Sequence, residues 1–119
     1  EFCAPEDTLS PVLQDIARKH SADFSGVLRS GGYVMIRGPF FEGRKYDKKF
    51  LASTGAKAVG MSVLPEACIC ALYEGVEVLG LAFITNDDSE THSHEANLEA
   101  AHIASFGLSQ FLTGVIGSL

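Results

Sequence analysis

The chain has 119 residues, a formal net charge of −6 and 46% hydrophobic residues. This length suits a single domain, residues 1–119, with enough apolar material for a core. The acidic balance argues against non-specific binding to nucleic acid. The sequence has no run of 18 apolar residues and does not begin with a basic segment followed by an apolar one. We therefore expect no transmembrane helix, no membrane partner and no signal peptide.

The cysteines favour a reducing compartment. There are three, Cys3, Cys68 and Cys70, and an odd number in a chain of this size favours thiols over disulfides. Cys68 and Cys70 lie two residues apart, so on a helix they face different directions and do not form a metal or redox pair. We expect a cytoplasmic protein with buried thiols at these two positions.

The amino-terminal part predicts a loop followed by a capped helix. Ser10 is a good N-cap and Pro11 suits the first helical position, with an apolar face continuing to about Lys19. Residues 27–29 could form a short strand that turns at residues 30–32 into the next strand, as a hairpin.

Residues 33–36 are apolar and predict a buried strand that ends at Gly38 and Pro39. Phe41 and Glu42 follow it directly, at the edge where open α/β sheets bind ligands. A helix is expected next, with Tyr46, Phe50 and Leu51 inward and Gly55 as its C-cap.

Two further strands end in polar or soft groups. Residues 57–64 predict a short strand that delivers Met61 and Ser62 to a loop, after which a helix runs from Pro65 to about Glu74. Residues 76–84 predict a third strand, which ends in Thr85 and Asn86.

Ser93 predicts the N-cap of a last helix that continues to about Val115. Six residues form its expected apolar stripe: Ala101, Ala104, Leu108, Phe111, Leu112 and Val115. The alternation of strands and helices predicts an α/β fold with three layers. Its sheet is mostly parallel or mixed with helices on both faces, and is incomplete in this chain, so a large apolar flank should be exposed.

Four separated motifs occur in one order. They are residues 33–42 (Tyr-Val-Met-Ile-Arg-Gly-Pro-Phe-Phe-Glu), residues 59–66 (Val-Gly-Met-Ser-Val-Leu-Pro-Glu), residues 84–86 (Ile-Thr-Asn) and residues 93–95 (Ser-His-Glu). In this order they resemble the carboxyl-terminal half of purine nucleoside phosphorylases of the trimeric class.

This resemblance implies a pentosyltransferase of purine salvage. It would convert inosine or guanosine and phosphate into the free base and ribose 1-phosphate, as a homotrimer. It implies no cofactor beyond inorganic phosphate as co-substrate. The family's amino-terminal half carries a Gly-rich phosphate loop that this sequence lacks, so the lone chain is expected to be inactive without that half.

The resemblance also implies residue roles. Asn86, Glu42 and His94 form the catalytic set: Asn86 bonds the purine at N7 and O6, Glu42 accepts from N1–H of a 6-oxopurine, and His94 contacts the ribose 5′-hydroxyl. Ser62 would bind phosphate. The remaining substrate-binding residues are Tyr33, Phe41, Gly60, Met61 and Thr85.

Each residue alone also has an ordinary structural interpretation. Glu42 could be a solvated loop carboxylate, Met61 a core side chain and Asn86 a turn residue. His92, His94 and His102 lack partners at ligand spacing, so we expect no metal site. The sequence departs from the family after Glu42, where Gly43 follows and an Ala-Glu pair is missing. A second hypothesis is therefore a non-catalytic purine- or nucleoside-binding module, or a degenerate relative kept for interaction.

Overall fold

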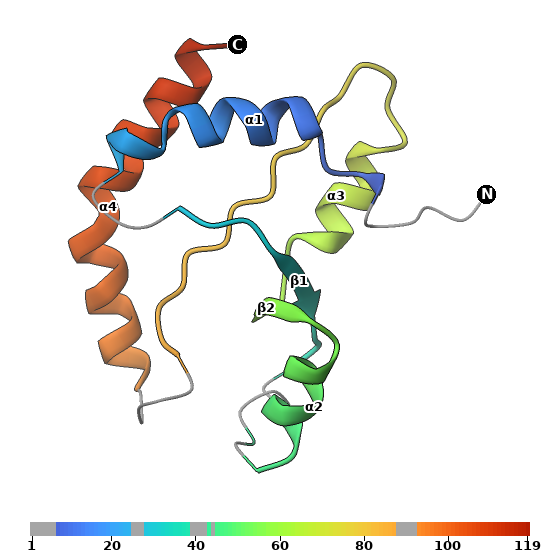
Figure 1. The fold of residues 1–119 in the computed structure, drawn as a ribbon, viewed down its shortest axis with the longest axis vertical. Helices are drawn as coiled ribbons and strands as arrows, with labels where there is room; N and C mark the ends of the chain where they lie inside the picture. The colour runs from blue at the N-terminus through green and yellow to red at the C-terminus, as the bar shows by residue number, and fades with distance from the viewer. Residues whose placement is uncertain (1–6, 25–27, 39–42, 44, 88–92) are drawn as a thin grey trace. The chain divides into compact units, whose positions relative to one another are not determined.

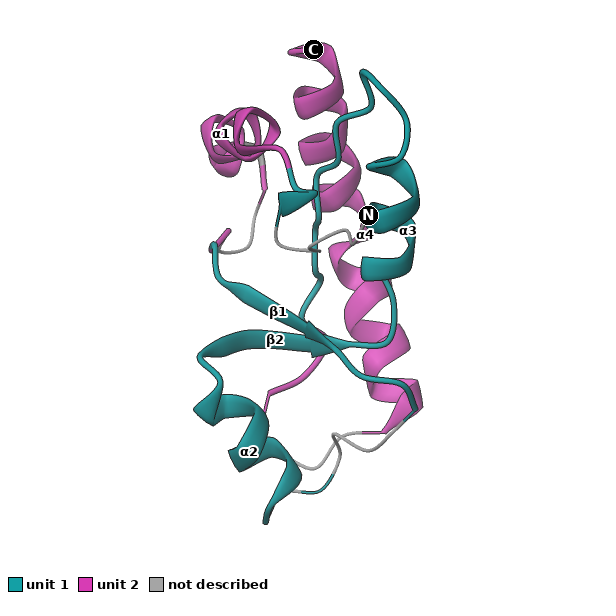
Figure 2. Cartoon of the chain, turned by 90° about the vertical axis from the view of Figure 1, so that its right-hand side faces the viewer, with its two compact units in different colours: residues 1–9, 30–84 teal, residues 10–29, 85–119 magenta. Residues whose placement is uncertain are grey.

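The structure is a computed structural model of residues 1–119, and it describes residues 7–24, 28–38, 43, 45–87 and 93–119 (Figure 1). The chain divides into two compact units, coloured separately in Figure 2. Unit 1 comprises residues 1–9 and 30–84, and unit 2 comprises residues 10–29 and 85–119. That residues 1–119 form one domain stays a prediction.

Unit 1 contains a parallel pair of strands. β1 (Gly32–Met35) pairs with β2 (Ala56–Gly60), so that Tyr33 lies opposite Ala58 and Met35 opposite Gly60. The backbone N–H of Ile36 donates to the carbonyl of Gly60 at 2.9 Å, extending the contact by one residue. Parallel strands need a crossover, and α2 (Asp47–Ser53) lies in it. The parallel pairing and the strand at residues 33–36 are confirmed.

The expected hairpin before β1 is wrong among the described residues. Leu28 and Arg29 form no strand, and the one strand paired with β1 is β2. Val27 lies outside the described residues.

α2 buries a different set of side chains from the one expected. Leu51 is buried at 8% exposure, but Tyr46 and Phe50 are 72% and 70% exposed. The helix begins only at Asp47 and has seven residues. So short a helix presents a narrow face inward, and a neighbour one position away points about 100° off that face. Gly55 does end the segment, with φ of 86°, as expected for the position after a helix.

α3 (Leu64–Cys70) begins near Pro65 as expected but ends earlier, at Cys70 rather than Glu74. Its continuation is two tight turns, Leu72 N–H to Ile69 O and Tyr73 N–H to Cys70 O. Leu72 and Tyr73 are exposed, so no burial holds a further helical turn in place. Cys68 and Cys70 are half-buried free thiols.

The third strand, expected over residues 76–84, is wrong. In the described part of unit 1 this segment forms one isolated parallel bridge, between Leu9 and Val78, and Figure 1 draws it as a thin tube. A strand is defined by its partners, and β1 and β2 pair only with each other here. The described residues thus form a two-stranded parallel sheet with four α-helices, as expected of an incomplete α/β fold. The three-layer arrangement stays a prediction.

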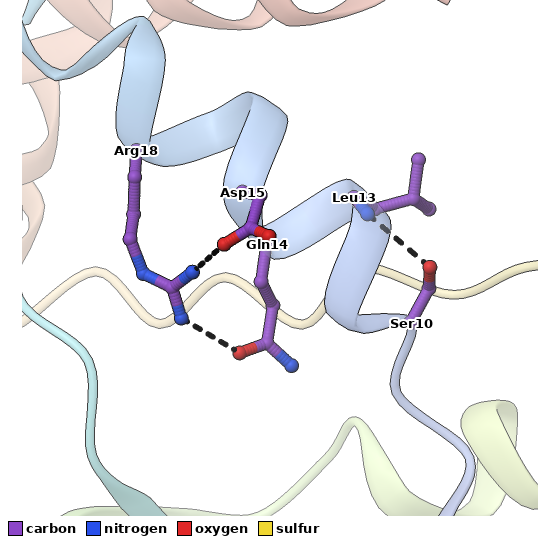
Figure 3. Close-up of polar contacts among 5 residues, drawn as sticks. All are labelled: Ser10, Leu13, Gln14, Asp15 and Arg18. Carbon is purple, nitrogen blue, oxygen red and sulfur yellow. Dashed lines mark hydrogen bonds and ion pairs between the residues drawn. The ribbon is translucent and has the colours of Figure 1, made fainter.

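Unit 2 begins with α1 (Pro11–Lys19), whose bounds agree with the expectation. The Ser10 hydroxyl accepts from the Leu13 backbone N–H at 3.2 Å, as Figure 3 shows. This bond satisfies one of the donors left free at a helix start. Further along, Arg18 bonds Gln14 and pairs with Asp15 on the exposed side of the helix, which contributes little to stability.

α4 (His94–Gly117) is the other helix of unit 2 and carries the buried side chains Phe111 and Val115. Ser93 caps it, with its hydroxyl accepting from Ala96 N–H at 3.2 Å. Ala104, Leu108 and Leu112 are half-buried, whereas Ala101 is exposed, so the expected stripe is confirmed except at its first residue.

Two contacts join the two chain segments of unit 2, residues 10–29 and 85–119. His20 Nε2 lies 2.6 Å from Ser118 Oγ, and the Phe24 and Phe111 rings lie 6.2 Å apart at a tilt of 59°, an arrangement that aromatic pairs favour. The 3₁₀ turn η2 (Ser21–Asp23) lies between His20 and Phe24. Among the described residues of this unit, the buried apolar side chains are Phe111 and Val115 on the carboxyl-terminal half of α4 and Ala17 on α1.

Many large apolar side chains are exposed, as expected for an incomplete sheet. On α4 these are Leu98, Ile103, Phe106 and Ile116. Among the described residues, α4 is the one helix whose length and composition would let it cross a membrane, a criterion that core helices of soluble proteins also meet. The absence of a membrane span stays a prediction.

Candidate functional site

The first group of predicted site residues lies at the carboxyl end of the strand pair in unit 1. Tyr33 on β1 crosses over Gly60, the last residue of β2, and its hydroxyl donates to the Ser62 backbone carbonyl at 3.0 Å. A Cβ at Gly60 would overlap that hydroxyl and come within 3.1 Å of Tyr33 Cζ. Gly60 thus acts by lacking a side chain, which lets Tyr33 hold the loop that follows β2.

This loop presents the next two predicted residues. Met61 is 57% exposed and Ser62 is exposed, so Met61 is not a core side chain of the described residues. Val63 follows with φ of 84°, a backbone conformation that costs a β-branched residue roughly 1–3 kcal/mol. Through the contacts of Tyr33 with Gly60 and Ser62, the structure brings together four predicted site residues: Tyr33, Gly60, Met61 and Ser62.

The second group lies in unit 2, around Asn86. Its Nδ2 atom donates to Thr85 Oγ1 and to Asn97 Oδ1, both at 3.2 Å. Asn97 belongs to the first turns of α4. Asn86 and Asn97 are eleven residues apart in the chain, and their side-chain amides are in contact.

His94 is the first residue of α4 and lies three positions before Asn97. Residues three apart lie on one side of a helix. Asn97 therefore links two predicted site residues, since it bonds Asn86 and shares a helix side with His94. His94 itself is exposed.

Sequence reasoning missed Asn97, although a signal was present. Asn97 continues the spacing of the α4 stripe backwards from Ala101 and Ala104, and it is half-buried. A polar residue at a position of the packed face is unusual for a helix. Asn is also a poor helix former because its side chain competes for backbone hydrogen bonds.

The remaining predicted residues are not placed. Phe41 and Glu42 lie outside the described residues. The two groups belong to different units, so the prediction that Glu42, Met61 and Asn86 surround one purine-sized hollow stays a prediction. Among the described residues no three side chains of His, Cys, Asp or Glu gather at a metal-binding distance. His92 lies outside the described residues.

The phosphorylase superfamily model matches residues 1–117, and the chain belongs to this family. The purine nucleoside phosphorylase of Bos taurus is 40% identical over 98 residues, which are 77% of this chain and 33% of that protein. Purine nucleoside phosphorylase 1 of Bacillus subtilis is 29% identical over 108 residues, 87% of this chain and 39% of that protein. The resemblance predicted from the four motifs is confirmed at this level.

The chain spans about a third of the length of the curated relatives it matches. The purine nucleoside phosphorylase of Saccharomyces cerevisiae is matched over a similar share of its length. It is 34% identical over 109 residues, which cover 77% of this chain and 34% of that protein.

Proposed function

We propose that this chain takes part in the phosphorolysis of purine nucleosides, in which inosine or guanosine and phosphate give the free base and ribose 1-phosphate. The observation that carries the proposal is the arrangement of Asn86. This exposed amide is held by Thr85 and Asn97, in a chain that is 40% identical over 98 residues to a protein named purine nucleoside phosphorylase.

The chemistry suits an amide. As the bond from sugar C1′ to the base nitrogen breaks, negative charge develops on the departing purine. Preorganised hydrogen-bonding groups directed at that charge lower the barrier. Asn86 has no charge of its own: its amino group donates to O6 of a 6-oxopurine, and its carbonyl oxygen accepts from N7–H when the departing base is protonated there.

Glu42 supplies the base preference in this proposal. A carboxylate accepts from N1–H and from a 2-amino group of hypoxanthine or guanine. It does not suit adenine, whose N1 is an acceptor. Phe41 stacks on the base.

The other residues bind the sugar and the phosphate. Met61 provides an apolar surface beneath the ribose, and its exposure of 57% leaves it accessible. Ser62 donates a hydroxyl to phosphate. Tyr33, Gly60 and Thr85 complete the substrate contacts, and His94 positions the 5′-hydroxyl.

The proposal includes a second polypeptide segment. The curated relatives are about three times as long as the part that this chain matches. An amino-terminal half would supply the phosphate loop, and assembly as a cytoplasmic homotrimer would complete the site. The reaction needs no cofactor beyond phosphate. The 119 residues alone are predicted to be inactive.

The test is hypoxanthine release from inosine by the complete protein that contains this chain. Asn86→Ala should lower kcat/KM by at least about 100-fold, as loss of one transition-state hydrogen-bonding group does elsewhere. The matched control is Ser105→Ala on α4, whose hydroxyl donates to the His102 carbonyl of the same helix; it should leave the rate unchanged. An unchanged rate for Asn86→Ala would remove Asn86 from the mechanism.

The second hypothesis, a purine-binding module without catalysis, rests on Gly43 and the missing Ala-Glu pair after Glu42. It predicts that titration with hypoxanthine gives a saturable binding signal while inosine is not cleaved. Inosine cleavage by the same sample would exclude it.

A further inference from the structure

We infer that Asn97 is a positioning residue that fixes which way the Asn86 amide faces. The inference rests on the proposed function and adds a residue to it. Its basis is the contact between the two amides, in which Asn86 Nδ2 donates to Asn97 Oδ1 at 3.2 Å.

An unrestrained Asn amide can turn by half a revolution about its terminal bond. Such a turn exchanges its carbonyl oxygen and its amino group, because the two have nearly the same shape. For a ligand with an ordered donor and acceptor edge, only one of the two orientations matches. Something must therefore select the orientation of Asn86.

Asn97 provides that selection. In the structure the Asn97 Oδ1 atom faces Asn86, and because this oxygen only accepts, it pairs with the amino group of Asn86 and not with its carbonyl oxygen. One Nδ2 hydrogen of Asn86 is held by Asn97, and the second is donated to Thr85 Oγ1. When a purine binds, the bond to Thr85 can be exchanged for one to purine O6, and the Asn86 carbonyl oxygen is left to accept from N7–H, which forms as the departing base takes up a proton from water.

Asn97 is itself held in place. Its backbone N–H donates to the Ser93 carbonyl at 3.1 Å, and the Ser93 hydroxyl caps the same turn through Ala96 N–H. The side chain is half-buried on the stripe that continues toward Phe111. A residue on a rigid, capped helix holds a partner more firmly than a loop residue does.

Two substitutions separate this role from a purely structural one. Asn97→Asp keeps an acceptor oxygen in the same place, whereas Asn97→Leu keeps the branched shape of the side chain and removes the acceptor. In the complete protein, with active sites titrated, Asn97→Leu should lower kcat/KM for inosine about 3- to 10-fold, the effect of one neutral hydrogen bond. Most of the loss should fall on kcat. Asn97→Asp should stay within about 2-fold of the unsubstituted protein.

A double-mutant cycle gives the second readout. In an Asn86→Ala background, Asn97→Leu should cause no further loss, because the residue that it orients is gone. Ser105→Ala is again the control. The inference is overturned if Asn97→Leu is fully active, if Asn97→Asp is as impaired as Asn97→Leu, or if Asn97→Leu lowers the rate equally in both backgrounds. Failure of the proposed function is distinguishable, since it is seen in the unsubstituted protein as an absence of inosine phosphorolysis.

Discussion

Gly60→Ala tests how the loop that carries Met61 and Ser62 is held. The new Cβ would overlap the Tyr33 hydroxyl and lie 3.1 Å from Cζ and 3.3 Å from Cε2 of the same ring. Tyr33 must then move, and its 3.0 Å hydrogen bond to the Ser62 carbonyl is lost. Overpacking of this kind costs about 1–3 kcal/mol, which includes roughly 1 kcal/mol for the hydrogen bond.

The assay is urea unfolding of the complete protein that contains this chain, monitored by circular dichroism. Tyr33→Phe alone should cost about 0.5–1.5 kcal/mol, because it removes only the hydrogen bond. In the double variant the hydroxyl that clashes is absent, so the combined cost should fall below the sum of the single costs by about 1 kcal/mol. Gly80→Ala is the matched control, since a Cβ there meets Leu9 at an ordinary 3.5 Å; it should change stability by less than about 0.5 kcal/mol. Strictly additive costs for the two site substitutions would refute the contact.

The two other predictions concern unit 2 and use the same assay. Phe111→Ala should destabilise the protein by about 3–5 kcal/mol, because the Phe111 ring is 2% exposed and contacts Phe24. The control is Phe106→Ala on the same helix, which should cost under about 0.5 kcal/mol because Phe106 is 73% exposed. Equal costs for the two substitutions would contradict the described core. Ser93→Ala should cost about 1 kcal/mol through loss of the bond to Ala96 N–H, with faster amide hydrogen exchange confined to the first turn of α4. An unchanged exchange rate at Ala96 would show that Ser93 is not the cap.

Features set by local chemistry were predictable from the sequence. Ser10 with Pro11 and Ser93 each mark a helix start, and both caps form with their own side chains. The turn at Gly55 was predictable in the same way, because glycine readily adopts the positive φ that is found there. Such signals act within a few residues, so a single sequence contains them.

Features that depend on distant partners were not predictable. Residues 76–84 have a strand-like composition, but a strand forms only beside another, and the partner is set by the rest of the fold. The same reason applies to Phe50 and Leu51, adjacent apolar residues of which only Leu51 is buried.

The same distinction applies to the candidate site, where residue types were predictable but contacts between distant residues were not. The residue types predicted for it follow from the four motifs. The polar Asn97 on an apolar stripe was a signal, but its contact with Asn86, eleven residues away, could not be predicted from it. Tyr33 and Ser62 likewise meet across 29 residues.

The most direct test of the account is the identity of the sugar product. The complete protein that contains this chain should convert inosine and phosphate into equal amounts of hypoxanthine and ribose 1-phosphate, followed by ³¹P nuclear magnetic resonance, with no hypoxanthine formed when phosphate is omitted. Release of free ribose independent of phosphate, or no release of hypoxanthine at all, would contradict the account.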